Sequence, residues 1–156
     1  MCHLFPGFSG SVTAVLIGAA NWCFHRATKT NDVIYNLGPG GDPHSYEPLL
    51  NRFLHLSEFV IGVATGSIVL IVGSSALHGQ GGRLPWFFAS PLVLIAASVV
   101  YGIGFMAYQV LTYENALHGN PHTASEYALN QTLGFSALSC FILGYVWLVF
   151  SATNMP

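Results

Sequence analysis

The stretch FVIGVATGSIVLIVGSSAL, Phe59–Leu77, contains no charged side chain. A bilayer core of about 30 Å needs roughly 20 predominantly apolar residues to be crossed by a helix, so this stretch is long enough. The rest of the chain has the same character, because only 6% of the 156 residues are charged, against about 25% in an average soluble domain. The sequence therefore predicts an all-α integral membrane protein in contact with the lipid bilayer.

The charged residues are also unevenly placed. All ten of them fall outside four uncharged segments, which are Met1–His25, Phe59–Gly82, Leu84–Tyr113 and Tyr127–Pro156. One membrane domain, residues 1–156, with an up-and-down bundle of four helices follows from this pattern. The expected helices are residues 4–24, 49–77, 85–113 and 125–151, with a polar loop at residues 25–48.

The first of these helices is the least well marked. Pro6, Gly7 and Gly10 interrupt its beginning, and the continuous apolar part, Val12–Phe24, is short. That length also suits a signal peptide or a helix lying in the membrane interface, although no Lys or Arg precedes it as a signal peptide requires. We favour a spanning or half-spanning helix. A three-helix protein, poorly structured before about residue 49, is the further alternative.

The connectors define the topology. The run from Gly38 to Pro43 is rich in turn-forming residues, and Gly119 and Pro121 interrupt the segment 114–124. Thr123 and Glu126 form a capping-box pattern, which marks the start of the last helix. Short connectors make the last three helices antiparallel neighbours.

Basic residues indicate the orientation. Arg26, Lys29 and Arg52 lie on one side of the expected membrane, and Arg83 lies on the other. Because Lys and Arg are enriched in cytoplasmic loops, this bias predicts that loops 25–48 and 114–124 are cytoplasmic. The same bias, with no targeting feature visible, predicts a bacterial-type inner membrane.

Small residues recur at helical spacing in the three long apolar segments. Small residues let membrane helices approach each other closely, so we predict that these glycines pack helices together, within the monomer rather than in a dimer. They are Gly62, Gly66 and Gly73 in the second helix, Gly102 in the third, and Gly134 and Gly144 in the fourth.

Several classes of function lack the residues they need. The net charge of −2 and the four basic residues offer no basic patch for nucleic acid. The three cysteines form no Cys-x-x-Cys pair, and the chain has no nucleotide-binding glycine loop. No histidine lies deep in facing helices, as a haem bound between them would require. No cofactor is predicted.

One cluster of potential metal ligands remains. His55 and Glu58 lie near the start of the second helix. His118 and His122 lie in the last connector, on the same predicted side, with Glu114 and Glu126 near them. Imidazole and carboxylate together can bind a first-row divalent metal. The alternative, which we favour, is that these are ordinary polar residues of the membrane interface.

Glu58 is the most unusual residue, because a carboxylate at the membrane boundary is costly unless it is paired or hydrated. Together with His55 it is a candidate for ion- or proton-linked function. We favour a non-enzymatic membrane protein or accessory subunit, with a membrane-protein partner or as a homo-oligomer. The alternatives are a small transporter or channel component using Glu58, with Gln109, Asn130 and Ser98 along its path, and a metal-dependent membrane enzyme.

Overall fold

The computed structural model of the chain describes residues 6–27, 37, 40–74, 85–120 and 122–153. These residues form four α-helices and two short 3-10 turns, and none of them forms a β-strand. The predicted all-α helical bundle is confirmed. The elements are α1 (Pro6–Ala27), η1 (Pro43–Tyr46), α2 (Glu47–Gly73), η3 (Trp86–Phe88), α3 (Ala89–Leu117) and α4 (Ala124–Thr153).

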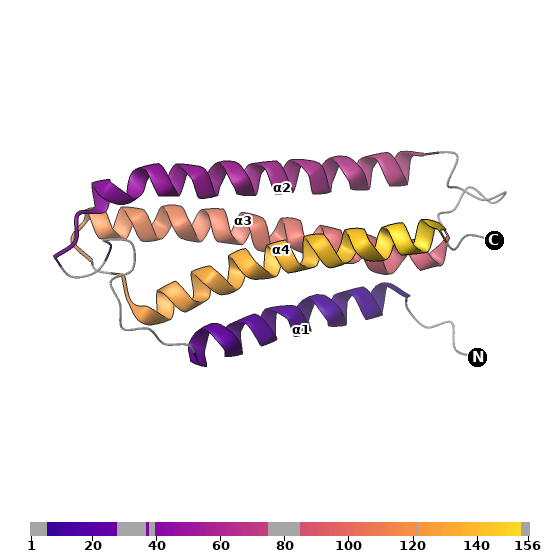
Figure 1. The fold of residues 1–156 in the computed structure, drawn as a ribbon, viewed down its shortest axis with the longest axis horizontal. Coiled ribbons are helices and arrows are strands. Elements are labelled where there is room, and N and C mark those ends of the chain that lie inside the picture. Colours follow the sequence, from indigo (N-terminus) through magenta and orange to yellow (C-terminus); the bar gives the residue numbers. More distant parts are fainter. Residues whose placement is uncertain (1–5, 28–36, 38–39, 75–84, 121, 154–156) are drawn as a thin grey trace.

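The four helices run side by side, and consecutive helices point in opposite directions (Figure 1). The most extensive contact joins α3 to α4, which form the centre of the bundle. α2 packs mainly on α3 and barely touches α4, whereas α1 packs on both α3 and α4. α1 and α2 therefore lie on opposite sides of the central pair (Figure 1). We call the end where α2 and α4 begin the η1 end.

Three helical segments are long and apolar enough to cross a membrane, which supports a small multi-pass membrane protein. They are Pro43–Gly73, Ala89–Leu117 and Ala124–Thr153. Within the described residues, α1 is not among these segments. Its 22 residues nevertheless extend for about 33 Å at 1.5 Å per residue. That α1 spans the bilayer stays a prediction.

The helix ends differ slightly from those expected. α3 begins at Ala89 rather than residue 85, because η3 precedes it, and it continues past Tyr113 to Leu117. The helix ends only where Gly119 adopts a left-handed φ of 79°. Residues 4–5 and 75–77 of the expected helices lie outside the described residues, as do 28–36 and 38–39 of the expected polar loop.

The capping box predicted for the last helix forms. The backbone N–H of Thr123 donates to the Glu126 carboxylate at 2.7 Å, and the Glu126 N–H donates to the Thr123 hydroxyl at 3.3 Å. The two bonds satisfy backbone donors that would otherwise be left at the start of a helix. This places the N terminus of α4 close to residue 124.

Three of the six predicted packing glycines lie at helix contacts. A Cβ added to Gly144 would lie 2.7 Å from Ile95 Cγ1, and one added to Gly134 would lie 3.0 Å from Phe105 Cε2. A Cβ on Gly102 would lie 3.2 Å from Ile61 Cγ1. At each point, a large side chain of one helix occupies the space that the glycine leaves.

The glycines of α2 behave differently. A Cβ added to Gly62, Gly66 or Gly73 would meet no atom of the described residues within 4 Å, so these glycines face away from the bundle. Instead of packing inside the monomer, as expected, they lie on its outer surface. The physical reason is that α2 contacts α3 through larger side chains, such as Ile61 against Gly102.

A fourth packing face, on α1, was not predicted. A Cβ on Gly10 would lie 2.6 Å from the Ser90 carbonyl oxygen, and one on Gly18 would collide with the Tyr101 hydroxyl. Ala14, midway between them, is buried, and its carbonyl accepts a hydrogen bond of 3.2 Å from Tyr101. The four-residue spacing of these small residues was the available signal, and it places α1 directly against α3.

Candidate functional site

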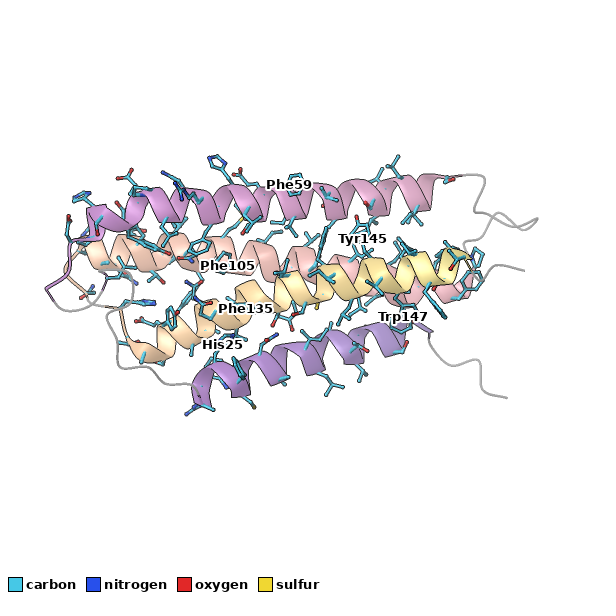
Figure 2. The ribbon with its side chains drawn as sticks, in the orientation of Figure 1. His25, Phe59, Phe105, Phe135, Tyr145 and Trp147 are labelled. Carbon is cyan, nitrogen blue, oxygen red and sulfur yellow. The ribbon has the colours of Figure 1, made fainter. Side chains whose placement is uncertain are left out.

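His55 and Glu58 lie together on the outer face of α2. His55 Nδ1 is 3.3 Å from Glu58 Oε2, and the two side chains are 80% and 60% exposed. Figure 2 shows the side chains around the bundle in the same view, with Phe59, the next residue, labelled on α2. Because both side chains are largely exposed, the His55–Glu58 pair is directed away from the interior of the bundle.

The polar residues expected along a transport path lie in the interior instead. Ser98, Gln109 and Asn130 are all buried. The Ser98 hydroxyl donates to the Ile95 carbonyl at 2.7 Å, and Gln109 Oε1 accepts from the Tyr46 hydroxyl at 2.7 Å. These two contacts hold Ser98 and Gln109 within the packing of α3, whereas Glu58 faces outward.

The other two candidate ligands separate at the α3–α4 turn. His118 is exposed just after α3, and the His122 side chain is only 2% exposed. The backbone N–H of His122 donates to the Leu37 carbonyl at 2.8 Å, which ties His122 to Leu37. Among the described residues, no three or more His, Cys, Asp or Glu side chains are placed to hold a metal ion together. The four-residue metal site considered from the sequence is therefore not assembled.

A polar pocket of about 260 Å³ lies at this turn, and we call it the His122 pocket. Within the described part of the chain, His122 Nδ1 has no hydrogen-bond partner, although it is buried. Burial lowers the pKa of His122, and the Glu126 carboxylate, 3.7 Å from Nδ1, acts in the opposite direction. The pocket is lined by Thr112, Asn115, Asn120, His122 and Glu126.

Three of these lining residues, Thr112, Asn115 and Asn120, were not identified from the sequence. Thr112 lies within the third helix expected from the sequence, residues 85–113, and Asn115 lies beyond its expected end, because α3 continues to Leu117. The added turn places Asn115 beside Thr112 in the lining of the pocket. The spacing of four between His122 and Glu126 was the only sequence signal for their approach.

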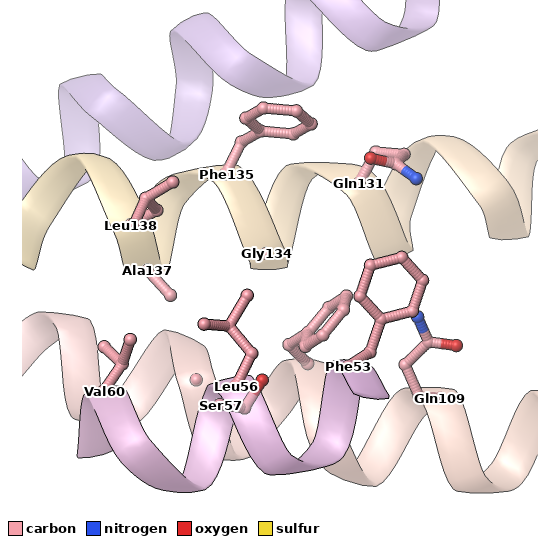
Figure 3. Close-up of a pocket in the computed structure, with 12 residues that line it drawn as sticks. Phe53, Leu56, Ser57, Val60, Gln109, Gln131, Gly134, Phe135, Ala137 and Leu138 are labelled. Atoms are coloured by element: carbon pink, nitrogen blue, oxygen red, sulfur yellow. The ribbon is translucent and has the colours of Figure 1, made fainter. Parts of the chain in front are cut away.

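A second cavity, of about 360 Å³, opens between α2 and α4, with α3 as its floor (Figure 3). It exists because α2 barely touches α4. Further along α2, the Tyr145 hydroxyl of α4 hydrogen-bonds to the Ser67 hydroxyl and, at 3.2 Å, to the Val63 carbonyl, which connects the two helices. The lining is mostly apolar and consists of Phe53, Leu56, Ser57, Val60, Gly102, Phe105, Gln109, Gln131, Gly134, Phe135, Ala137 and Leu138.

Comparison of the chain with protein-family models, curated protein sequences and solved structures finds no match in any of the three. The functional argument therefore depends on the surfaces and side chains described above. Two features are the most informative: the outward glycines of α2 and the buried imidazole of the His122 pocket.

Proposed function

We propose that this chain is a non-enzymatic membrane protein that acts by assembling laterally in the bilayer, and that it pairs with a second copy of itself through α2. The contact surface, which we call the α2 glycine face, consists of Gly62, Gly66 and Gly73 with His55 and Glu58. The observation that carries the proposal is the open space beside all three glycines, since no atom of the described residues lies within 4 Å of an added Cβ.

The burial of α2 is one-sided. Of its 27 residues, only Leu50 and Ala64 are buried, whereas α3, of similar length, has ten buried residues. In lipid, apolar side chains gain little from leaving one apolar environment for another, so helices associate where small residues allow close packing. A helix with small residues along its exposed face is suited to a contact between chains.

Geometry favours a second copy as the partner. Two copies inserted in the same orientation bring their α2 helices together in parallel, which is the arrangement that Gly-x-x-x-Gly pairs support. Two-fold symmetric dimers are also the commonest homo-oligomers. In such a dimer the His55–Glu58 pairs of both chains lie at the same depth, so the imidazole of one copy can reach the carboxylate of the other.

The orientation belongs to the same proposal. Loops 25–48 and 114–124 face the cytoplasm of a bacterial-type inner membrane, because three of the four basic residues lie on that side. The bundle gives less support to a transport role for Glu58. Its side chain lies on the outer face of α2, away from the buried Ser98 and Gln109.

The test is the oligomeric state of the full chain in mild detergent and in liposomes. We expect light scattering in detergent, and energy transfer between labelled chains in liposomes, to report a dimer for the wild type. Replacement of both Gly62→Ile and Gly66→Ile should give a monomer, because two branched side chains keep the helices apart. The fold of the monomer should survive, since the space beside both glycines is open.

Ala107→Ile is the matched control, because it adds bulk at an exposed position of α3 and should leave the dimer intact. Circular dichroism should show the same helix content for all variants. A wild-type chain that stays monomeric at every protein-to-lipid ratio would overturn the proposal. So would a Gly62→Ile, Gly66→Ile double variant that dimerises as strongly as the wild type.

A further inference from the structure

We propose that the His122 pocket binds a first-row divalent cation such as Zn²⁺, with the His122 imidazole and the Glu126 carboxylate as its two principal ligands. The site lies at the η1 end, between the end of α3 and the start of α4. It differs from the four-residue site considered from the sequence, because it uses neither His55 nor His118. It also does not depend on the proposed dimer.

The first argument is the buried imidazole nitrogen. Nδ1 of His122 has no hydrogen-bond partner among the described residues, and its side chain is almost wholly buried. Leaving a buried polar atom without a partner is unfavourable, because its desolvation is not compensated. A neutral imidazole is the commonest metal ligand in proteins, so a bound cation would satisfy this atom.

The second argument is the distance to the carboxylate. His122 Nδ1 and Glu126 Oε2 are 3.7 Å apart. Two ligands that each lie about 2.1 Å from a tetrahedral Zn²⁺ are separated by roughly 3.4 Å. The observed separation is therefore within a few tenths of an ångström of the value that a shared coordination shell requires.

The third argument is that both ligands are already held in place. The Glu126 carboxylate accepts hydrogen bonds of 2.7 Å from the backbone N–H and the hydroxyl of Thr123. The backbone N–H of His122 donates a hydrogen bond to the Leu37 carbonyl. Hydrogen bonds that orient ligating carboxylates are a regular part of metal sites, and they reduce the entropy lost on binding.

The remaining lining is compatible with a cation. Thr112, Asn115 and Asn120 each carry a side-chain oxygen atom, and among the described residues the lining includes the Glu126 carboxylate but neither Lys nor Arg. The pocket of about 260 Å³ also has room for the water molecules that would complete the shell, since each water occupies about 30 Å³. With only two such ligands, binding should be weaker than at a closed site with four protein ligands.

The experiment is a Zn²⁺ titration of the purified, metal-free full chain in detergent, by calorimetry and by competition with a chromophoric chelator. We expect one Zn²⁺ per chain. Glu126→Gln should weaken binding at least about tenfold while preserving the start of α4, because Gln also serves in a capping box. His122→Gln should weaken it similarly, and circular dichroism checks that this buried substitution leaves the helices formed.

His118→Gln and His55→Gln are the matched controls, since both remove an exposed imidazole outside the pocket. Both should bind Zn²⁺ like the wild type, and so should the Gly62→Ile, Gly66→Ile variant, which separates this site from the dimer. Absence of stoichiometric Zn²⁺ would overturn the proposal. So would wild-type affinity in Glu126→Gln, or loss of binding in either histidine control.

Discussion

Gly144→Ala tests whether the contact between α3 and α4 depends on a missing side chain. The new Cβ would lie 2.7 Å from Ile95 Cγ1, 3.2 Å from the Ile95 nitrogen and 3.3 Å from Leu94 Cβ. Ile95 and Leu94 are fully buried, so neither can turn aside without displacing other atoms of the interface. We expect the two helices to move apart locally and the protein to lose stability.

The size of the effect follows from two opposing contributions. Overpacking a well-filled interior costs typically about 1–3 kcal/mol. Replacing glycine by alanine within a helix returns about 0.8–1.0 kcal/mol through helix propensity. Gly104→Ala is the control, because its new Cβ would lie at an ordinary contact distance, 3.7 Å, from Leu133 Cδ2. Both substitutions bring the same gain in helix propensity, so the difference in stability between the two variants measures the cost of overpacking.

The assay is equilibrium unfolding of both variants by sodium dodecyl sulfate in mixed micelles, followed by circular dichroism. We expect Gly144→Ala to be less stable than Gly104→Ala by about 1–3 kcal/mol, and Gly104→Ala to equal or exceed the wild type. If the two free energies of unfolding agree within about 0.5 kcal/mol, the close approach of α4 to α3 at Gly144 is refuted.

Two hydroxyl groups provide further predictions in the same assay. Tyr46→Phe leaves Gln109 Oε1 buried without the Tyr46 donor, and should cost about 1–3 kcal/mol; a change below about 0.5 kcal/mol would mean that water replaces the hydroxyl. Tyr145→Phe removes the hydrogen bonds to Ser67 and Val63 and should cost about 0.5–1.5 kcal/mol. Because these bonds join α2 to α4, hydrogen exchange should also quicken in the second half of α2, and unchanged exchange there would contradict this reasoning.

The helices could be predicted because their signals are local. Long uncharged segments separated by charged connectors define them, and the Thr123–Glu126 capping box marks the start of α4. The end of α3 was missed because Glu114 was interpreted as part of a connector. A single charge does not end a helix that still has its backbone hydrogen bonds, whereas the positive φ of Gly119 does.

The packing faces were predictable only in part. Glycine spacing indicates that a helix face can be approached closely, but not which helix approaches it. Ile61 of α2 packs against Gly102, whereas no described part of the chain lies within 4 Å of a Cβ added to Gly62 or Gly66. The spacing therefore indicated faces that are closely packed on α3 and α4, whereas on α2 it indicated a face that the rest of the described chain does not cover.

The candidate site depended on contacts that the sequence does not encode locally. His118 and His122 are four residues apart, yet the turn at Gly119 leaves one exposed and the other buried. The burial of His122 involves Leu37, which is far away in the chain, through a hydrogen bond of 2.8 Å. Only the assembled bundle brings these two residues together.

The position of α1 and α2 on opposite sides of the α3–α4 pair has a consequence for biosynthesis. The ribosome completes α1 and α2 first, but these helices pack against α3 and α4, which emerge later. We expect the nascent chain to hold its first two helices apart until α3 is translated. A chain truncated after residue 82 should therefore expose α1 and α2 to protease as two independent segments, and mutual protection in that truncated chain would contradict this order of assembly.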